Sequence, residues 1–130
     1  MAHRKTAGRL ADLSIASRPE TRFRIRILDT FGERLRGLLG RRALAETEGV
    51  LLSPCRSIHT AFMRFPVDAV FLDANGTVLR VKSDLRPFRL AACATAASVA
   101  ELSAGACARA GIRAGDRLLV SPVSGQNGNP

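Results

Sequence analysis

The 130-residue chain contains no tryptophan and no tyrosine, and its twenty basic residues include only two lysines, Lys5 and Lys82. Proteins that bind single-stranded nucleic acid place aromatic side chains among basic ones, so that bases can stack on them. The basic residues of this chain are not interleaved in that way, and it has neither a zinc-finger nor an RNA-recognition pattern. These absences argue against a dedicated nucleic-acid-binding domain, although the formal net charge is +9.

Long apolar runs and paired cysteines are also absent. A spanning helix needs about 18 or more apolar residues, and Glu101 interrupts the alanine-rich stretch that follows Leu90. Residues 1–19 lack the apolar segment of a secretory signal. The three cysteines form no Cys-x-x-Cys pair, and an odd number fits free thiols in a reducing compartment better than disulfides. We therefore expect a soluble, cytoplasmic protein.

Length and composition allow one domain. A composition of 46% hydrophobic and 24% charged residues is ordinary for a globular protein and excludes wholesale disorder or a fibrous repeat. The positive charge is concentrated in residues 1–42, which hold eleven Lys and Arg against four acids. We expect a flexible basic arm over residues 1–20, a globular domain over 21–122 and a disordered Gly- and Asn-rich tail over 123–130.

Hydrophobic patterning predicts a largely β domain. Residues 21–28 alternate charged and apolar side chains, as a half-buried strand does. The run 49–53 reads as a short buried strand that ends at Pro54. Between them, Thr30 and Glu33 have the spacing of a capping box, and leucines at helical spacing follow, so we expect a short helix that ends near Gly40.

The second half of the chain begins with a hairpin. The apolar runs 67–73 and 77–81 flank Asn75-Gly76, a pair that tolerates the positive φ of a tight turn. Residues 91–110 are ambiguous, because their alanine content favours one long helix. The alternative is a strand over 98–102 followed by a short helix over 103–110.

The end of the chain carries two further signals. Gly111 is placed to end a helix, with Ile112 as the accompanying apolar contact. Gly115-Asp116 then predicts a turn into a last strand over residues 117–121.

Reactive residue types are densest between Pro54 and Asp68. Cys55, His59 and Met63 are spaced four apart, so they share a face in a helix or in a regular strand. A histidine beside a cysteine can lower the pKa of the thiol, and the two side chains can also bind a soft metal. The alternative is a buried cysteine, a histidine bonded to backbone and a core methionine. We assign no metal, because a closed zinc site needs four ligands.

Asp68 stands out because both faces of its predicted strand are apolar. An unpaired buried charge is prohibitive, so Asp68 must be satisfied by an arginine, by backbone N–H groups, or by a ligand or metal. Nearby arginines can form an anion-binding rim or a solvated basic face. These arginines are Arg36, Arg41, Arg56 and Arg64.

Five blocks in order give the chain a family resemblance: Arg-Gly-Leu-Leu from Arg36, residues 49–52, residues 58–73, residues 100–105 and residues 111–116. They resemble the domain of unknown function 192 family, also called uncharacterised protein family 0127. Many members carry a Trp-Met-Lys-Asn-Thr run where this chain has His59-Thr-Ala-Phe-Met. The resemblance implies a compact, mainly β domain with one or two short helices, and it favours the strand over 98–102. It implies no activity.

The expected fold is therefore mainly β (α+β), a small barrel-like domain, and three functions stay open. The first is a non-enzymatic accessory module without a cofactor, which binds a small anionic ligand or a peptide. Its pocket would be lined by Arg36, Cys55, His59, Thr60, Met63 and Asp68. The second is a hydrolase with Cys55 as nucleophile, His59 as base and Asp68 as orienting group, or a metal-assisted version of it. The third is weak nucleic-acid binding through the basic arm.

Overall fold

The computed structural model describes residues 9–28, 44–60 and 65–123. Within these ranges the protein is mainly β, with one short helix. The elements are β1 (Arg9–Ile15), β2 (Arg18–Leu28), β3 (Glu48–Leu52), β4 (Ser57–His59), β5 (Val67–Leu72), β6 (Val78–Leu85), β7 (Leu90–Ala92), β8 (Ser98–Ser103), α2 (Ala106–Ala110) and β9 (Leu118–Pro122).

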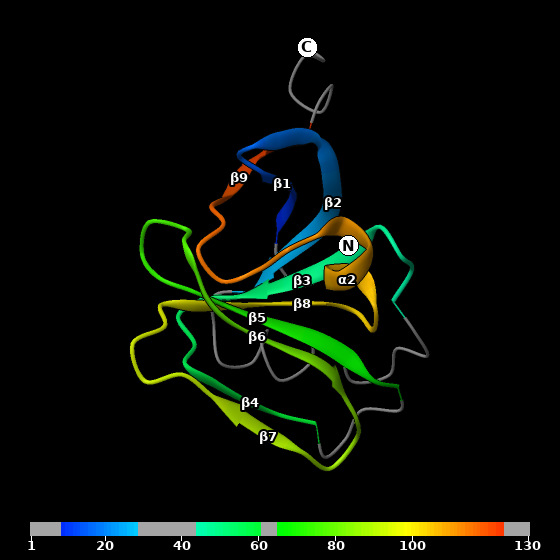
Figure 1. Cartoon of the computed structure of the whole chain (residues 1–130), viewed down its shortest axis with the longest axis vertical. Helices are drawn as coiled ribbons and strands as arrows, with labels where there is room; N and C mark the ends of the chain where they lie inside the picture. Colours follow the sequence, from blue (N-terminus) through cyan, green and yellow to red (C-terminus); the bar gives the residue numbers. More distant parts are fainter. Residues whose placement is uncertain (1–8, 29–43, 61–64, 124–130) are drawn as a thin grey trace, which may run out of the picture.

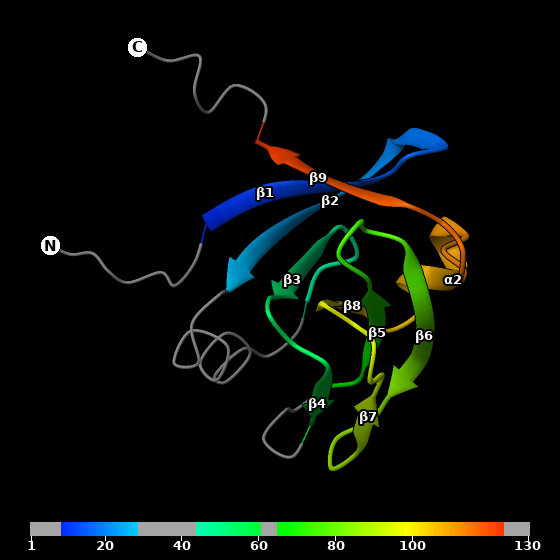
Figure 2. The same cartoon turned by 90° about the vertical axis from the view of Figure 1, so that its left-hand side faces the viewer.

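Seven of the strands form one mixed sheet in the order β6-β5-β8-β3-β2-β1-β9, and β4 pairs with β7 in a separate ladder (Figure 1). Only β2 and β3 run parallel, and the other pairs are antiparallel. Figures 1 and 2 both place β9, β1 and β2 at one end of the molecule and the β4-β7 ladder at the opposite end.

Side chains from the two faces of the sheet enter two separate apolar clusters. Consecutive residues of one strand alternate between them: Val99 belongs to one cluster and Ala100 to the other, and Leu51 and Leu52 are divided in the same way. This period of two follows from strand geometry. Strand β5, second from the β6 edge of the sheet, is buried along its whole length, so a polar residue on either of its faces meets the protein interior.

The hairpin and strand predictions are largely confirmed. Residues 21–28 lie in β2, which begins earlier, at Arg18, and residues 49–52 lie in β3. The predicted hairpin is the β5-β6 pair, and Gly76 in its turn has φ of 85°. Of the two alternatives for residues 91–110, one long helix is wrong, and a strand over 98–102 followed by a short helix is confirmed by β8 and α2. Gly111, with φ of 72°, ends α2 as predicted, and Ile112 is buried.

The prediction of a flexible arm over residues 1–20 is wrong for residues 9–20. Residues 9–15 form β1, which pairs with β2 on one side and β9 on the other. Leu13 and Ile15 are each only 1% exposed. The alternate apolar side chains of this segment therefore pack into the core, and the segment forms a strand although it lies in the basic part of the sequence. Residues 1–8, the predicted helix near 30–40 and the tail from residue 124 lie outside the described residues, and Val123 is buried.

The two edges of the seven-stranded sheet approach each other at one point. An isolated bridge joins Thr77 to Arg117, and the Leu118 N–H donates to the carbonyl of Gly76 at 2.8 Å. The pairing does not continue along the edges as a ladder, so the barrel-like closure is not confirmed. In the described ranges, no helix is long and apolar enough to cross a membrane.

Candidate functional site

Asp68 is completely buried on β5, and its carboxylate binds backbone amides. Oδ1 accepts a hydrogen bond from the Asp84 N–H at 2.8 Å, and Oδ2 accepts from the N–H groups of Gly105 and Cys107 at 3.1 and 3.0 Å. Since a carboxylate offers about four acceptor positions, these three donors use most of its capacity. Asp68 therefore ties β6 and the start of α2 to β5.

The amides that reach Asp68 come from places where the backbone is irregular. Asp84 has φ of 53°, and the β5-β6 register shifts between Val67 and Ala69. Gly105, at the N-terminus of α2, has φ of 91° and offers no side-chain cap. The first N–H groups of a helix have no partner within the helix. Asp68, which the sequence predicted to need a partner, thus accepts hydrogen bonds from backbone N–H groups that have no regular partner in the sheet or the helix.

Cys107 is the thiol beside Asp68, and sequence reasoning did not select it. Its side chain is buried. Burial raises the pKa of the thiol to about 12, and the negative charge of Asp68 and their hydrogen bond act in the same direction. At neutral pH the group therefore stays protonated, and a protonated thiol is a poor nucleophile.

Of the predicted cluster between residues 55 and 68, the structure describes the side chains of Cys55, Thr60 and Asp68. Cys55 is partly buried, and its thiol donates to the carbonyl of Ser57 at 3.1 Å. His59 lies on β4 opposite Leu90 of β7, and its side chain is outside the described part. None of the hydrogen bonds between Asp68 and described residues involves Cys55 or Thr60. Arg36, Arg41, Met63 and Arg64 lie outside the described residues, and Arg56 is exposed.

Thr60 is fully buried and fastens the turn between β6 and β7. Its hydroxyl donates to the Arg86 carbonyl at 2.6 Å and accepts from the Arg89 N–H at 2.8 Å. Its own N–H donates to the Arg89 carbonyl at 2.9 Å, and its carbonyl accepts from the Phe88 N–H at 3.1 Å. With these bonds in place, Thr60 serves to hold this turn.

Glu101 is a second buried acid, which sequence reasoning also passed over. It lies on β8 and is 2% exposed, and its Oε1 has no hydrogen-bond partner in the described part of the chain. Burial raises the pKa of this carboxyl to about 8. The same sequence signal that singles out Asp68, an acid inside an apolar strand-forming run, also marks Glu101.

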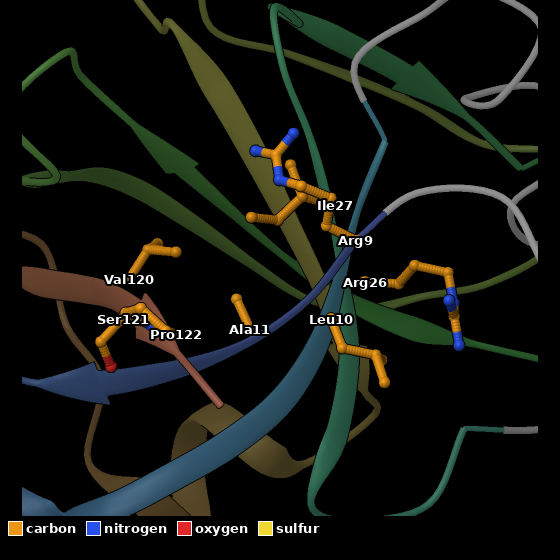
Figure 3. Close-up of a pocket in the computed structure, with 8 residues that line it drawn as sticks. All are labelled: Arg9, Leu10, Ala11, Arg26, Ile27, Val120, Ser121 and Pro122. Carbon is orange, nitrogen blue, oxygen red and sulfur yellow. The ribbon is translucent and has the colours of Figure 1, made fainter. Parts of the chain in front are cut away.

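A groove of about 640 Å³ lies between β1, β2 and β9 (Figure 3). In Figure 3 the side chains of Arg9, Ile27 and Val120 lie on one side of β1, while those of Leu10 and Arg26 lie on the other. A guanidinium group thus stands beside apolar walls. The full lining is Arg9, Leu10, Ala11, Arg26, Ile27, Val120, Ser121 and Pro122.

Metal ligation finds no support in residues 9–28, 44–60 and 65–123, which contain no group of three His, Cys, Asp or Glu side chains placed to hold a metal ion.

The model of the DUF192 family, described as uncharacterized ACR, matches residues 13–120. The chain belongs to the DUF192 family. This confirms the resemblance found in the sequence blocks. The match begins within β1, so it includes the last three residues of a strand that the sequence alone placed in a flexible arm.

Two crystal structures share the fold of this DUF192 chain. One, from Sinorhizobium meliloti 1021, is described as a candidate transcription regulator; it is 22% identical, with a TM-score of 0.81 over 90% of this chain and 98% of that one. The other, a protein of unknown function from Novosphingobium aromaticivorans, is 22% identical, with a TM-score of 0.79 over 92% of this chain and 91% of that one. No curated protein matches the DUF192 chain in sequence.

Proposed function

We propose that this protein is a non-enzymatic binding module that holds a small anionic ligand, or the carboxylate end of a peptide, in the groove between β1, β2 and β9. The observation that carries the proposal is the lining of the groove, where Arg9 lies beside its cross-strand neighbour Ile27, and Val120 adds an apolar side chain further along β1. Ligand sites commonly have volumes of about 300 to 1,000 Å³, apolar walls and a few polar groups that orient the ligand.

The lining of the groove supports an anion site better than the described surroundings of Asp68 do. An anion would not approach Asp68, because that side chain is buried, negatively charged and bonded to backbone amides. Arginine, in contrast, matches a carboxylate or phosphate in bidentate geometry. The same bonds at Asp68 weigh against the hydrolase alternative, in which this carboxylate would have to orient the His59 imidazole.

The test is an NMR titration of the ¹⁵N-labelled protein with 8-anilinonaphthalene-1-sulfonate, an anionic probe with an apolar body. We expect shifts at residues 9–11, 26–27 and 120–121. Arg9→Ala and Val120→Glu should each weaken binding about tenfold, which corresponds to about 1.4 kcal/mol. Arg113→Ala, which removes the same charge from an exposed turn, is the matched control. Shifts centred on residues 55–60, or unchanged affinity in both groove variants, would overturn the proposal.

Nucleic-acid binding is the second candidate, because the chain carries a net charge of +9 and one structural neighbour is described as a candidate transcription regulator. Residues 9–20 belong largely to β1 and β2, so the test removes residues 1–8 only. Binding to a DNA duplex that falls steeply with salt and is lost with these residues would favour this candidate. Absent or salt-insensitive binding would eliminate it.

A further inference from the structure

The turn between β6 and β7 exposes two large apolar side chains. Phe88 is 75% exposed and Leu90 is 71% exposed, whereas the other exposed large hydrophobic residues of the described chain lie between 39% and 46%. We call residues 86–90, Arg-Pro-Phe-Arg-Leu, the basic tip. Scattered apolar residues on a surface are normal, but two this close together mark a candidate contact site.

The basic tip is held rigidly in its exposed conformation. The buried Thr60 binds both Arg86 and Arg89 through its hydroxyl, and its backbone carbonyl binds the Phe88 N–H. Phe88 has φ of 64°, a left-handed conformation that bulky side chains rarely adopt. Such strain persists only where the surroundings impose it, and it clusters at functional sites. The bonds from Thr60 thus hold the Phe88 backbone in a conformation that leaves its ring in water.

Positive charge surrounds the two apolar side chains. Between residues 80 and 90 the chain carries four basic side chains and one acid, Asp84. Arg86 contacts Asp84 at 3.4 Å in an exposed ion pair, and such pairs interact weakly in water. Figures 1 and 2 show β7 at the end of the molecule opposite β9, so this surface is separate from the groove.

We propose that the basic tip binds the interface of an anionic lipid bilayer. Phe88 and Leu90 would enter the boundary between headgroups and acyl chains, while Arg86 and Arg89 would contact lipid phosphates. A lipid surface fits better than a protein partner because the exposed apolar area of the basic tip is small. A stable protein interface buries about 800 Å² on each side, and an aromatic side chain contributes at most about 250 Å². A bilayer needs no matching pocket.

The test is co-sedimentation of the full chain with vesicles of phosphatidylcholine, with and without about one-third phosphatidylglycerol. We expect binding at least tenfold stronger to the anionic vesicles, because each basic side chain gains about 1 kcal/mol near such a surface. The double variant Phe88→Gly/Leu90→Ser should bind at least tenfold more weakly. Its folding should not suffer, because both side chains are exposed and glycine accepts a positive φ.

Two further variants make the experiment specific. Leu119→Ser replaces another exposed leucine, on β9 and outside the groove lining, and should bind vesicles like the parent. Because the chain has no tryptophan, Leu90→Trp provides a single fluorophore whose emission should shift to the blue and be quenched by brominated lipids. Absence of binding to anionic vesicles, or full binding by the double variant, would overturn the proposal. Photo-crosslinking from position 88 to a protein without vesicle binding would favour a protein partner instead.

Discussion

Asp68 and Glu101 are two buried acids on neighbouring strands with opposite surroundings. In the β5-β8 ladder Asp68 stands opposite Leu102, and Ala69 opposite Glu101, so the two acids are only one register position apart. Asp68 accepts three backbone hydrogen bonds. Glu101 has an oxygen without a partner among the described residues. Burial alone therefore does not show whether a buried acid has hydrogen-bond partners among the described residues.

The difference follows from the local supply of donors. Asp68 lies next to a register shift in β6 and to the start of α2, where backbone N–H groups have no regular partner. Glu101 lies inside a ladder that is paired on both sides, with β3 and with β5. There the strands use one another's amides, and the cross-strand partners of Glu101 are the apolar residues Val50 and Ala69. Among the described residues, irregular backbone therefore supplies donors to Asp68 and not to Glu101.

The largest expected effect is that of Asp68→Ala. It would leave one buried and two partly buried N–H groups without a charged acceptor, at about 1.5 to 3 kcal/mol each, so we expect a loss of about 5 kcal/mol in the free energy of unfolding. Urea denaturation measures it. Asp73→Ala is the matched control, because Asp73 accepts two backbone bonds in the more exposed hairpin turn, where water can replace it. Equal costs for the two variants would contradict the structural role of Asp68.

Glu101 should make stability depend on pH. Because its pKa is raised from 4.5 to about 8 in the folded protein, the folded state keeps a proton that the unfolded state has released. Below pH 4.5 both states are protonated and the group contributes no difference. Stability then falls as pH rises through the window from 4.5 to 8, by an amount on the order of 5 kcal/mol, and levels off above it.

Glu101→Gln isolates this contribution, since glutamine has nearly the same shape and does not titrate. The difference in unfolding free energy between variant and parent should grow in favour of the variant from pH 5 to pH 8, as measured by urea denaturation in a series of buffers. The other titrating groups are common to both proteins and cancel. A difference that stays constant with pH would show that Glu101 is paired in solution, and the contrast with Asp68 would disappear.

The smallest effect is on the reactivity of Cys107. It tests the surroundings of Asp68 without changing a residue of the β5-β8 ladder. Two variants each keep a single cysteine: Cys55→Ser/Cys93→Ser keeps Cys107, and Cys93→Ser/Cys107→Ser keeps Cys55. Iodoacetamide should label Cys107 in the first at least tenfold more slowly than Cys55 in the second. The reason is the pKa of about 12 that burial and Asp68 impose. In urea both thiols should react alike. Fast labelling of native Cys107 would mean that the environment of Asp68 is open to water.

Local patterns predicted the elements whose signal is strong. Alternation located β2, and Asn75-Gly76 located the β5-β6 hairpin, because both signals come from backbone geometry within a few residues. β1 was missed because its alternation, carried by Ala11, Leu13 and Ile15, is embedded in a basic segment. The three-residue strands β4 and β7 are too short to show a period, and only their mutual pairing defines them.

The candidate site was less predictable. The sequence indicated that Asp68 needs a partner, but the donors come from residues 84, 105 and 107, up to 39 positions away. The spacing that related Cys55, His59 and Met63 assumed one regular element, whereas residues 57–59 form a separate short strand. The groove combines Arg9 with Val120 from opposite ends of the chain.

The sequence alone determined that this protein belongs to a mainly β family and where several of its strands lie, because those properties depend on side-chain periodicity and on ordered motifs within a short stretch of chain. Tertiary structure decided which buried acid finds hydrogen-bond donors, which arginine faces apolar walls and which apolar side chains stay in water. Each of these outcomes depends on groups brought together from distant positions, and no local pattern records that proximity.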